Sequence, residues 1–167
     1  MKRFNIIENI LIENRYARIV EVGVLKGQTL RYILQSECKN FITDYWAVDP
    51  WPHQHGGDPR HRQVCRFIPF FPQLRIIRLT SVEAAQLLNN KYLSRGYLDF
   101  GFIDADHSYE SVKEDISVWL PHIRAGGMLT GHDYGRRYPG VKKAVDEVFG
   151  IDNIEVINEV WIKRIDK

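Results

Sequence analysis

The sequence has little sulfur and no long apolar run. Cys38 and Cys65 are the only cysteines among 167 residues, and they are not spaced as a CxxC pair. We interpret both as free thiols of a cytoplasmic protein, which excludes a small scaffold held by disulfides. No apolar run approaches the ~20 residues that span a bilayer, so we expect no membrane partner.

Neither sign of charge predominates. The 23 lysine and arginine residues nearly balance the 21 aspartate and glutamate residues, and the net charge is +2. This small excess does not predict a polyanionic partner, so we expect no nucleic acid. Hydrophobic residues make up 44% of the chain, which is enough for the core of one soluble globular domain.

Strand patterns alternate with helix patterns along the chain. Short β-branched or apolar runs predict strands at ARIVEVG, YWAVDPW, LRIIRL, LDFGFID and MLTGHDY. Apolar residues at helical spacing follow each run. This alternation predicts one α/β domain over residues 1–167, with a mostly parallel sheet and helices on both faces. IEVIN and VWIKRI follow each other so closely that they predict an antiparallel hairpin, which brings the sheet to seven strands.

Proline and glycine predict some of the element boundaries. Pro69 should end a short helix over residues 64–68, and Gly126 with Gly127 should turn the chain into the fifth strand. Pro139 and Gly150 should begin and end the helix PGVKKAVDEVF.

Unusual polar residues follow each of the five predicted βα strands. They lie in the segments EVGVLKG, DPW, TS, DADH and GHDY. In an open α/β sheet, ligands bind outside the carboxyl ends of the strands. We therefore expect these segments to form one site.

The segment EVGVLKG has the pattern E-x-G-x-x-x-G. Gly23 can turn at positive φ, and Gly27 allows a ligand to approach closely. The pattern is not the dinucleotide fingerprint G-x-G-x-x-G, and the carboxylate of Glu21 would repel a phosphate. Glu21 suits a ligand with an amino or sulfonium group instead. Asp49, at the end of the second strand, is placed to accept two hydrogen bonds from a ribose diol.

The ordered segments EVGVLKG, VDPW, LTSVEAA, FIDADHSYESVKEDISVWLPHIRAGGMLTGHDY and PGVKKAVDEVF resemble the class I S-adenosylmethionine-dependent methyltransferases. The similarity covers about residues 17–165, and it is most specific from Phe102 to Tyr134. It is closest to the subgroup of catechol O-methyltransferase-like and antibiotic-sugar O-methyltransferases. The resemblance implies a Rossmann-like methyltransferase fold whose last strand is antiparallel.

The resemblance also implies roles for single residues. By position, the resemblance assigns three residues to the methionine moiety of the cofactor: Glu21, Gly23 and Gly27. It assigns Asp49 to the ribose, and Ser81 with Pro50 or Trp51 to the adenine. In metal-dependent relatives, an aspartate that matches Asp104 binds Mg²⁺ beside the cofactor. A second aspartate that matches Asp106 acts as the base, and a pair of acidic residues after the fifth strand completes the site.

In this chain, that last pair is His132 and Asp133. Mg²⁺ prefers oxygen ligands, and an imidazole ligand shifts the preference toward Mn²⁺, Fe²⁺ or Zn²⁺. Three arrangements stay open. His132 lies outside the coordination shell of a Mg²⁺ ion held by Asp104 and Asp133, or the site uses another metal such as Mn²⁺, or it uses none.

Asp106 and His107 are the candidate catalytic residues. Asp106 could instead cap the helix that follows it, and His107 could instead bond a neighbouring carbonyl group. Asp133 is harder to explain without a function, because a carboxylate at the end of a central strand is costly unless it is paired.

The connector WPHQHGGDPRHRQ contains His53, His55 and His61, and Cys65 follows it. This spacing does not match a closed zinc site, so we expect residues 51–63 to form a lid or substrate loop. Arg136 and Arg137 either hold an anionic group of the substrate or form a solvated pair.

The predicted function is transfer of a methyl group from S-adenosylmethionine to an oxygen of a small molecule or a sugar. A hydroxyl acceptor needs a base such as Asp106 or His107, or a cation held by Asp104 and Asp133. A chain of 167 residues has little material for an insertion that covers the acceptor. We therefore expect an acceptor site that is open, covered by the lid, or completed by a second subunit in a homodimer.

Three other functions stay open. The first is N-methylation, or methylation of a larger acceptor such as a glycan or a peptide. The second is a binding module without catalysis, which the presence of all five polar segments disfavours. The third is a nicotinamide-dependent oxidoreductase, which Glu21 and the missing dinucleotide fingerprint disfavour.

Overall fold

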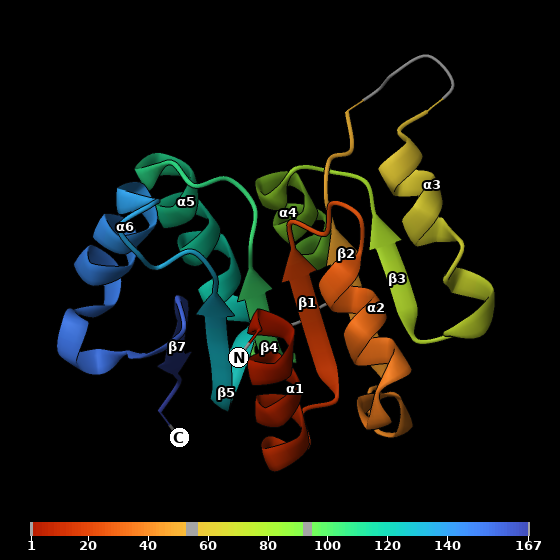
Figure 1. The fold of residues 1–167 in the computed structure, drawn as a ribbon, viewed down its shortest axis with the longest axis horizontal. Helices are drawn as coiled ribbons and strands as arrows, with labels where there is room; N and C mark the ends of the chain where they lie inside the picture. The colour runs from red at the N-terminus through yellow and green to blue at the C-terminus, as the bar shows by residue number, and fades with distance from the viewer. Residues whose placement is uncertain (1, 53–56, 92–94, 167) are drawn as a thin grey trace.

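The computed structural model describes residues 2–52, 57–91 and 95–166. Its centre is a seven-stranded sheet with the order β3-β2-β1-β4-β5-β7-β6 (Figure 1). The strands are β1 (Arg18–Val22), β2 (Asp44–Val48), β3 (Leu74–Ile77), β4 (Leu98–Ile103), β5 (Ile123–Gly131), β6 (Glu155–Ile157) and β7 (Val160–Arg164). The first five strands are parallel, and β7 runs antiparallel to both β5 and β6. The predicted α/β architecture is confirmed.

Helices cover both faces of the sheet. They are α1 (Arg3–Asn14), α2 (Gln28–Gln35), α3 (Pro59–Cys65), α4 (Ser81–Lys91), α5 (Tyr109–Trp119) and α6 (Pro139–Phe149). One buried apolar cluster contains residues of α1, α2 and α3, and a second cluster contains residues of α4, α5 and α6. The central strands therefore carry apolar side chains on both faces, and β4 is buried along its whole length.

Local signals in the sequence set several boundaries. Thr80 and Glu83 form a capping box before α4, in which Glu83 accepts from the Thr80 backbone N–H at 3.0 Å. Pro139 is at the first turn of α6, and Gly150 follows its last residue. The hairpin between β6 and β7 turns at Asn158 and Glu159, which have φ values of 45° and 64°. Positive φ at both positions is typical of a tight hairpin turn.

Two predicted boundaries were wrong. The strand β5 begins at Ile123, so Gly126 and Gly127 lie inside it rather than before it. Its register with β4 shifts between Leu98 and Phe100, and a Cβ atom on Gly127 would lie 2.7 Å from the carbonyl oxygen of Asp99. Glycine therefore allows a close approach of two strands here. The helix expected at residues 64–68 instead covers Pro59–Cys65, because Asp58 caps it by accepting from the N–H of Arg60.

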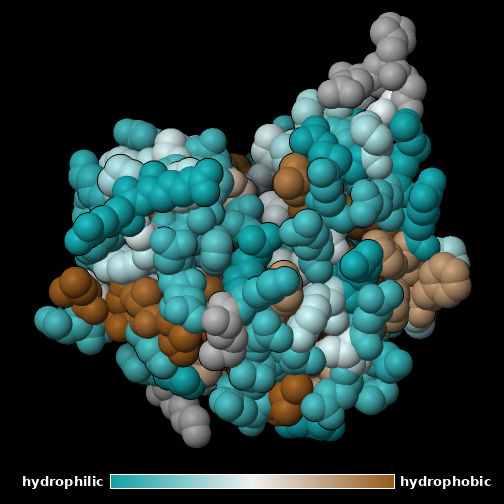
Figure 2. Space-filling model, viewed as in Figure 1, coloured by the Kyte–Doolittle hydropathy of each residue, from teal (hydrophilic) through white to brown (hydrophobic). Residues whose placement is uncertain are grey.

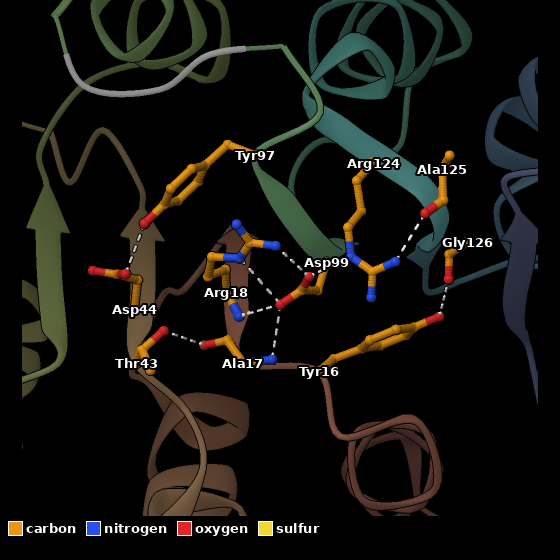
Figure 3. A network of polar contacts seen from close by, with 10 residues as sticks. All are labelled: Tyr16, Ala17, Arg18, Thr43, Asp44, Tyr97, Asp99, Arg124, Ala125 and Gly126. Atoms are coloured by element: carbon orange, nitrogen blue, oxygen red, sulfur yellow. Dashed lines mark hydrogen bonds and ion pairs between the residues drawn. The ribbon is translucent and has the colours of Figure 1, made fainter. Parts of the chain in front are cut away.

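The amino ends of the central strands are joined by a buried carboxylate (Figure 3). Asp99 of β4 accepts from the backbone N–H groups of Ala17 and Arg18 at 2.9 and 2.8 Å. It also forms ion pairs with the side chains of Arg18 at 2.9 Å and Arg124 at 2.6 Å. This network ties β4 to β1 and β5 at the edge of the sheet opposite the polar segments.

The surface in the view of Figure 2 is mostly hydrophilic, with hydrophobic side chains gathered below α6. The exposed large hydrophobic residues in that part of the chain are Val148, Ile151 and Val156. Within the described residues, no helix combines the length and the apolar character needed to cross a bilayer.

Candidate active site

A cavity of about 990 Å³ lies at the carboxyl ends of β1, β2 and β4. This is the edge of the sheet to which the parallel strand arrows point in Figure 1, and Figure 2 shows the surface notched there between α5 and α3. The predicted residues that line it are Glu21, Gly23, Asp49, Pro50, Ser81, Asp104, Asp106, His107, His132 and Asp133. The polar segments therefore meet in one site, as predicted.

Glu21 is the most buried acidic group of this cavity. It is the penultimate residue of β1, is 2% exposed, and accepts a 2.5 Å hydrogen bond from the hydroxyl of Tyr45. Burial raises the pKa of Glu21 to about 8, against the lowering effect of that hydrogen bond. The carboxyl group is therefore largely protonated at neutral pH, and a cationic ligand group beside it would favour its ionised form.

Gly23 and Gly27 shape the loop after β1. Gly23 has φ of 90°, and a Cβ atom there would lie 2.1 Å from the carbonyl oxygen of Asp104. Glycine is thus required for the loop to lie against the end of β4. Gly27, at φ of 70°, precedes α2 and would place a Cβ atom 3.0 Å from Val64. The close approach at Gly27 is to α3, and Gly27 is not among the lining residues of the cavity.

Asp49 holds the same loop. Its Oδ2 atom accepts from the N–H of Leu25 at 2.8 Å, and its Oδ1 atom accepts from the N–H of Trp51 at 2.9 Å. Trp51 is fully buried and donates from its indole to the carbonyl oxygen of Leu25 at 2.8 Å. Of the two alternatives for the adenine, only Pro50 lines the cavity. Trp51 instead packs in the core, because its indole bonds the loop.

Asp115 of α5 was missed by the sequence reasoning. It is 5% exposed and lines the cavity beside Ser81, whose hydroxyl accepts from the indole of Trp119 at 2.9 Å. Burial raises the pKa of Asp115 to about 6, and a hydrogen bond with Ser81 acts against that rise. The sequence does contain a signal for Asp115. It is a carboxylate on the apolar face of α5, which also carries Val112 and Trp119.

Asp106 is exposed, and its side chain is hydrogen-bonded within a local turn. Its Oδ1 atom accepts from the N–H of Ser108 at 2.7 Å. Hydrogen bonds from Ser108 lower its pKa, which makes Asp106 a weaker base. The predicted alternative of a helix cap was wrong, because the N-cap of α5 is Ser108, which accepts from the N–H of Ser111.

His107 and Asp133 form a close polar pair at the ends of two neighbouring strands. The Nε2 atom of His107 lies 2.7 Å from Oδ2 of Asp133, and its ring stacks on Tyr138 with 4.1 Å between centroids. Asp133 has φ of 62°, a left-handed conformation that aspartate tolerates better than most residues. Its Oδ1 atom lies 3.1 Å from Nδ1 of His132. Asp133 therefore lies between two imidazoles, at a strained position of the kind found in active sites.

Asp104 is held by a cation from another part of the chain. The Nε atom of Arg3, in the first turn of α1, lies 3.3 Å from Oδ2 of Asp104. Burial raises the pKa of Asp104 to about 6, although Arg3 and His132 act to lower it. Nothing in the sequence around Arg3 signalled this contact.

The three predicted metal ligands do not all converge. Nδ1 of His132 lies 3.8 Å from Oδ1 of Asp104 and 3.1 Å from Oδ1 of Asp133, and it forms no hydrogen bond within the described residues. Ligand atoms of Asp104, His107 and Asp133 do lie within 4.8 Å of one another. However, Arg3 holds Asp104 and His107 holds Asp133, so the carboxylates are already paired. These contacts do not fit the divalent-metal site that the resemblance implies.

The model of a family described as a methyltransferase domain matches residues 20–134. The chain belongs to this methyltransferase family. The match runs from the middle of β1 past Asp133 and so includes every polar segment that lines the cavity. It confirms the resemblance to class I S-adenosylmethionine-dependent methyltransferases.

Two curated relatives of this methyltransferase domain are uncharacterized proteins. Protein R132 of Acanthamoeba polyphaga mimivirus is 27% identical over 150 residues, which cover 87% of this chain and 66% of the relative. Protein y4gI of Sinorhizobium fredii is 26% identical over 125 residues, which cover 71% of this chain and 13% of the relative. The chain thus spans less than two thirds of the length of each.

Solved O-methyltransferases share the fold of the methyltransferase domain. An O-methyltransferase from Bacillus cereus, in complex with SAH, has a TM-score of 0.73 at 13% identity, covering 99% of this chain and 80% of that protein. CalS11, a TDP-rhamnose 3'-O-methyltransferase of calicheamicin biosynthesis, has a TM-score of 0.72 at 14% identity, covering 95% of this chain and 77% of that protein. These likenesses confirm the Rossmann-like methyltransferase fold.

The connector over residues 51–63 was predicted to be a lid or substrate loop rather than a zinc site, but its residues from Pro59 onward belong to the helix α3. His53 and His55 lie outside the described residues. Nε2 of His61 lies 3.4 Å from Sγ of Cys65, and the His61 ring is 5.0 Å from the ring of Trp51. Among the described residues, neither His61 nor Cys65 belongs to a group of three metal-binding side chains.

The two arginines after β5 differ. Arg137 lines the cavity, and its guanidinium lies 5.3 Å from the ring centroid of Tyr138. Arg136 lines a separate depression with residues of α6. Glu159, in the β6–β7 turn, also lines the main cavity, and the sequence reasoning had not identified it.

Proposed function

We propose that this domain transfers a methyl group from S-adenosylmethionine to a hydroxyl oxygen of a small polar acceptor such as a sugar. The observation that carries the proposal is the 2.7 Å pairing of His107 with Asp133, in the same cavity as Glu21 and Asp49. The family match and the two structural neighbours named as O-methyltransferases support it.

The cavity offers suitable groups for each part of S-adenosylmethionine, which when bound supplies an electrophilic methyl group on its sulfonium. Glu21 would hold the amino group, because an ammonium favours the ionised form of a buried carboxyl. Asp49 lines the cavity and would accept from the ribose hydroxyls. Pro50 and Ser81 would contact the adenine. The volume of about 990 Å³ is at the upper end of the ~300–1,000 Å³ range of ligand pockets, which leaves room for an acceptor.

His107 would act as the general base. Asp133 favours the tautomer in which Nε2 of His107 carries the proton, which leaves Nδ1 with the lone pair. Nδ1 would take the hydroxyl proton as the bond from acceptor oxygen to methyl carbon forms and the bond from methyl carbon to sulfur breaks. Asp133 would then stabilise the imidazolium. Asp106 contributes less to this step, because its pKa is lowered.

The acceptor side of the cavity is polar. Arg3, Arg137 and Glu159 line it, and Tyr138 is its aromatic residue. A wall of this kind suits an acceptor with several hydroxyl groups, which can donate to Glu159 and accept from the arginines.

A thermal-melt titration with S-adenosylhomocysteine tests the cofactor site, with NADH as the parallel ligand. At about 100 times its Kd, a ligand stabilises by roughly 2.7 kcal/mol, a shift on the order of 5–10 °C for this size. A shift with S-adenosylhomocysteine alone would support the proposal and justify a screen of sugars and other hydroxyl acceptors with methyl-labelled S-adenosylmethionine. A shift with NADH alone, or with neither ligand, would refute it.

A further inference from the structure

Arg3 reaches the site from the start of the chain. It lies in the first turn of α1, and this helix is anchored by four buried side chains, Ile6, Ile7, Ile10 and Leu11. Figure 1 shows α1 in front of the centre of the sheet, beside α2. The Nε atom of Arg3 also lies 3.5 Å from the hydroxyl oxygen of Thr29 on α2. The guanidinium is thus held by two elements, which makes its position over Asp104 part of the fold.

Asp104 needs a cation. Its side chain is 13% exposed, and Asp133 adds a second negative charge nearby. A carboxylate removed from water is costly unless a positive charge or hydrogen-bond donors compensate. Arg3 is the closest group that is always charged, because a guanidinium stays protonated in proteins. The imidazole of His132 is farther from Asp104, at 3.8 Å.

We propose that Arg3 is the resident cation of this active site, standing at Asp104 where the metal-dependent relatives place Mg²⁺. The proposal rests on the proposed function for the identity of the site, but the contacts of Arg3 do not depend on it. Arg3 is a positioning residue. It keeps Asp104 ionised and oriented, and it leaves the proton transfer to the pair of His107 and Asp133.

A guanidinium in this position opposes the binding of a divalent ion. Two cations that share one buried carboxylate repel each other strongly, because the local dielectric constant is low. Oδ2 of Asp104 is engaged by Arg3, and Oδ2 of Asp133 is engaged by His107. The Oδ1 atoms of the two aspartates lie beside Nδ1 of His132, at 3.8 Å for Asp104 and 3.1 Å for Asp133.

Removal of the guanidinium should therefore create a metal site. With Arg3 shortened to alanine, Asp104 gains a carboxylate oxygen that can bind an ion together with Asp133 and His107, whose ligand atoms lie within 4.8 Å of it and of each other. This donor set of two carboxylates and one imidazole suits Mn²⁺ better than Mg²⁺. The gain of a site on loss of a side chain is an effect that a merely structural arginine would not produce.

The test is isothermal titration of the full chain with Mn²⁺ alone, without cofactor or acceptor. We expect Arg3→Ala to bind one Mn²⁺ at least about tenfold more tightly than the wild type. The double variant Arg3→Ala with Asp104→Asn should lose that gain. Arg3→Lys keeps a positive charge and should stay close to the wild type. Arg31→Ala removes an exposed arginine of α2 and serves as the matched control.

Two results would overturn the proposal. Tight Mn²⁺ binding by the wild type that Asp104→Asn abolishes would mean that the ion displaces Arg3. Equally weak Mn²⁺ binding by the wild type and by Arg3→Ala would mean that Arg3 does not prevent a metal ion from binding. Far-ultraviolet circular dichroism confirms that each variant is folded. The melt with S-adenosylhomocysteine is separate, so failure of the methyltransferase proposal is distinguishable from failure of this one.

Discussion

Nε2 of His107 lies 2.7 Å from Oδ2 of Asp133, although the two residues are 26 positions apart and follow different strands. The pair forms because β4 and β5 are parallel neighbours, with Ile103 opposite Gly131 in the register. Each residue comes shortly after the end of its strand. Parallel pairing thus brings an imidazole from one loop against a carboxylate from the next.

Loss of this pair should remove turnover and leave cofactor binding intact. We expect His107→Ala to lower kcat by about 10²–10⁴-fold, the usual contribution of a general base. Asp133→Asn should also lower kcat, because it removes the charge that stabilises the imidazolium. The melting shift with S-adenosylhomocysteine should be unchanged in both variants.

The control for that prediction is Asp106→Asn, which changes a neighbouring carboxylate whose pKa is already lowered by Ser108. We expect it to retain most of the activity. A larger loss in Asp106→Asn than in His107→Ala would identify Asp106 as the base instead.

Cofactor binding should depend on pH through Glu21. Burial raises its pKa to about 8, so below that pH the unliganded protein holds a proton on this carboxyl. If the ammonium of S-adenosylhomocysteine pairs with Glu21, binding releases the proton, and affinity rises as the pH approaches about 8. Titration calorimetry in buffers of different ionisation enthalpy measures the protons released. Glu21→Gln should bind more weakly, with little proton release, and an equal release in this variant would contradict the assignment.

Gly140 should be required for the position of His107. A Cβ atom on Gly140 of α6 would lie 2.6 Å from the carbonyl oxygen of His107 and 2.8 Å from the backbone nitrogen of Tyr109. We expect Gly140→Ala to lower stability by roughly 1–3 kcal/mol, as overpacking does, although alanine is the better helix former. The kcat should fall with it. Val148→Ala, at an exposed position of the same helix, is the control. A Gly140→Ala variant that is more stable and fully active would show that α6 can shift to make room for the added methyl group at little cost.

Asp99 should stabilise the protein in a manner that depends on pH. Burial acts to raise its pKa, but hydrogen bonds from Arg18, Arg124 and two backbone N–H groups outweigh it and lower the pKa to about 2. A lowered pKa in the folded state contributes stability above the unfolded value of about 4, and that stability is lost as pH falls toward 2. Asp99→Asn should therefore lose at least roughly 2 kcal/mol at pH 7. Urea unfolding of both proteins at pH 7 and pH 3 measures this, and a difference that does not shrink at low pH would contradict the ion-pair explanation.

Much of the fold followed from local patterns. The apolar run LDFGFID is a strand because buried strands of a parallel sheet are apolar on both faces. Pro139 and Gly150 mark the ends of α6 because they fit the first turn and the end of a helix. Boundaries failed where contacts between elements decided them. Residues 123–127 are strand because Ile123 pairs with Leu98 of β4 and the two glycines exchange backbone hydrogen bonds with Ile165, although the glycines suggested a turn.

The candidate site was predicted in part. The polar segments were expected to meet because the carboxyl ends of parallel strands lie at one edge of the sheet, and ten of the predicted residues do line one cavity. The family resemblance placed either Pro50 or Trp51 at the adenine, but the indole of Trp51 bonds the carbonyl oxygen of Leu25 in the core. Position in the sequence does not fix the direction of a side chain after a turn.

The sequence by itself determined the alternation of strands and helices, the hairpin at the end, and which side chains gather at the carboxyl edge. These depend on periodicity, turn residues and sheet topology, which are local or follow from few rules. Only the tertiary structure decided that Arg3 holds Asp104, that Asp133 pairs with His107, and that Asp115 faces the cavity. These contacts join distant parts of the chain, and they are fixed by how α1, α5 and the strand-end loops pack on the sheet.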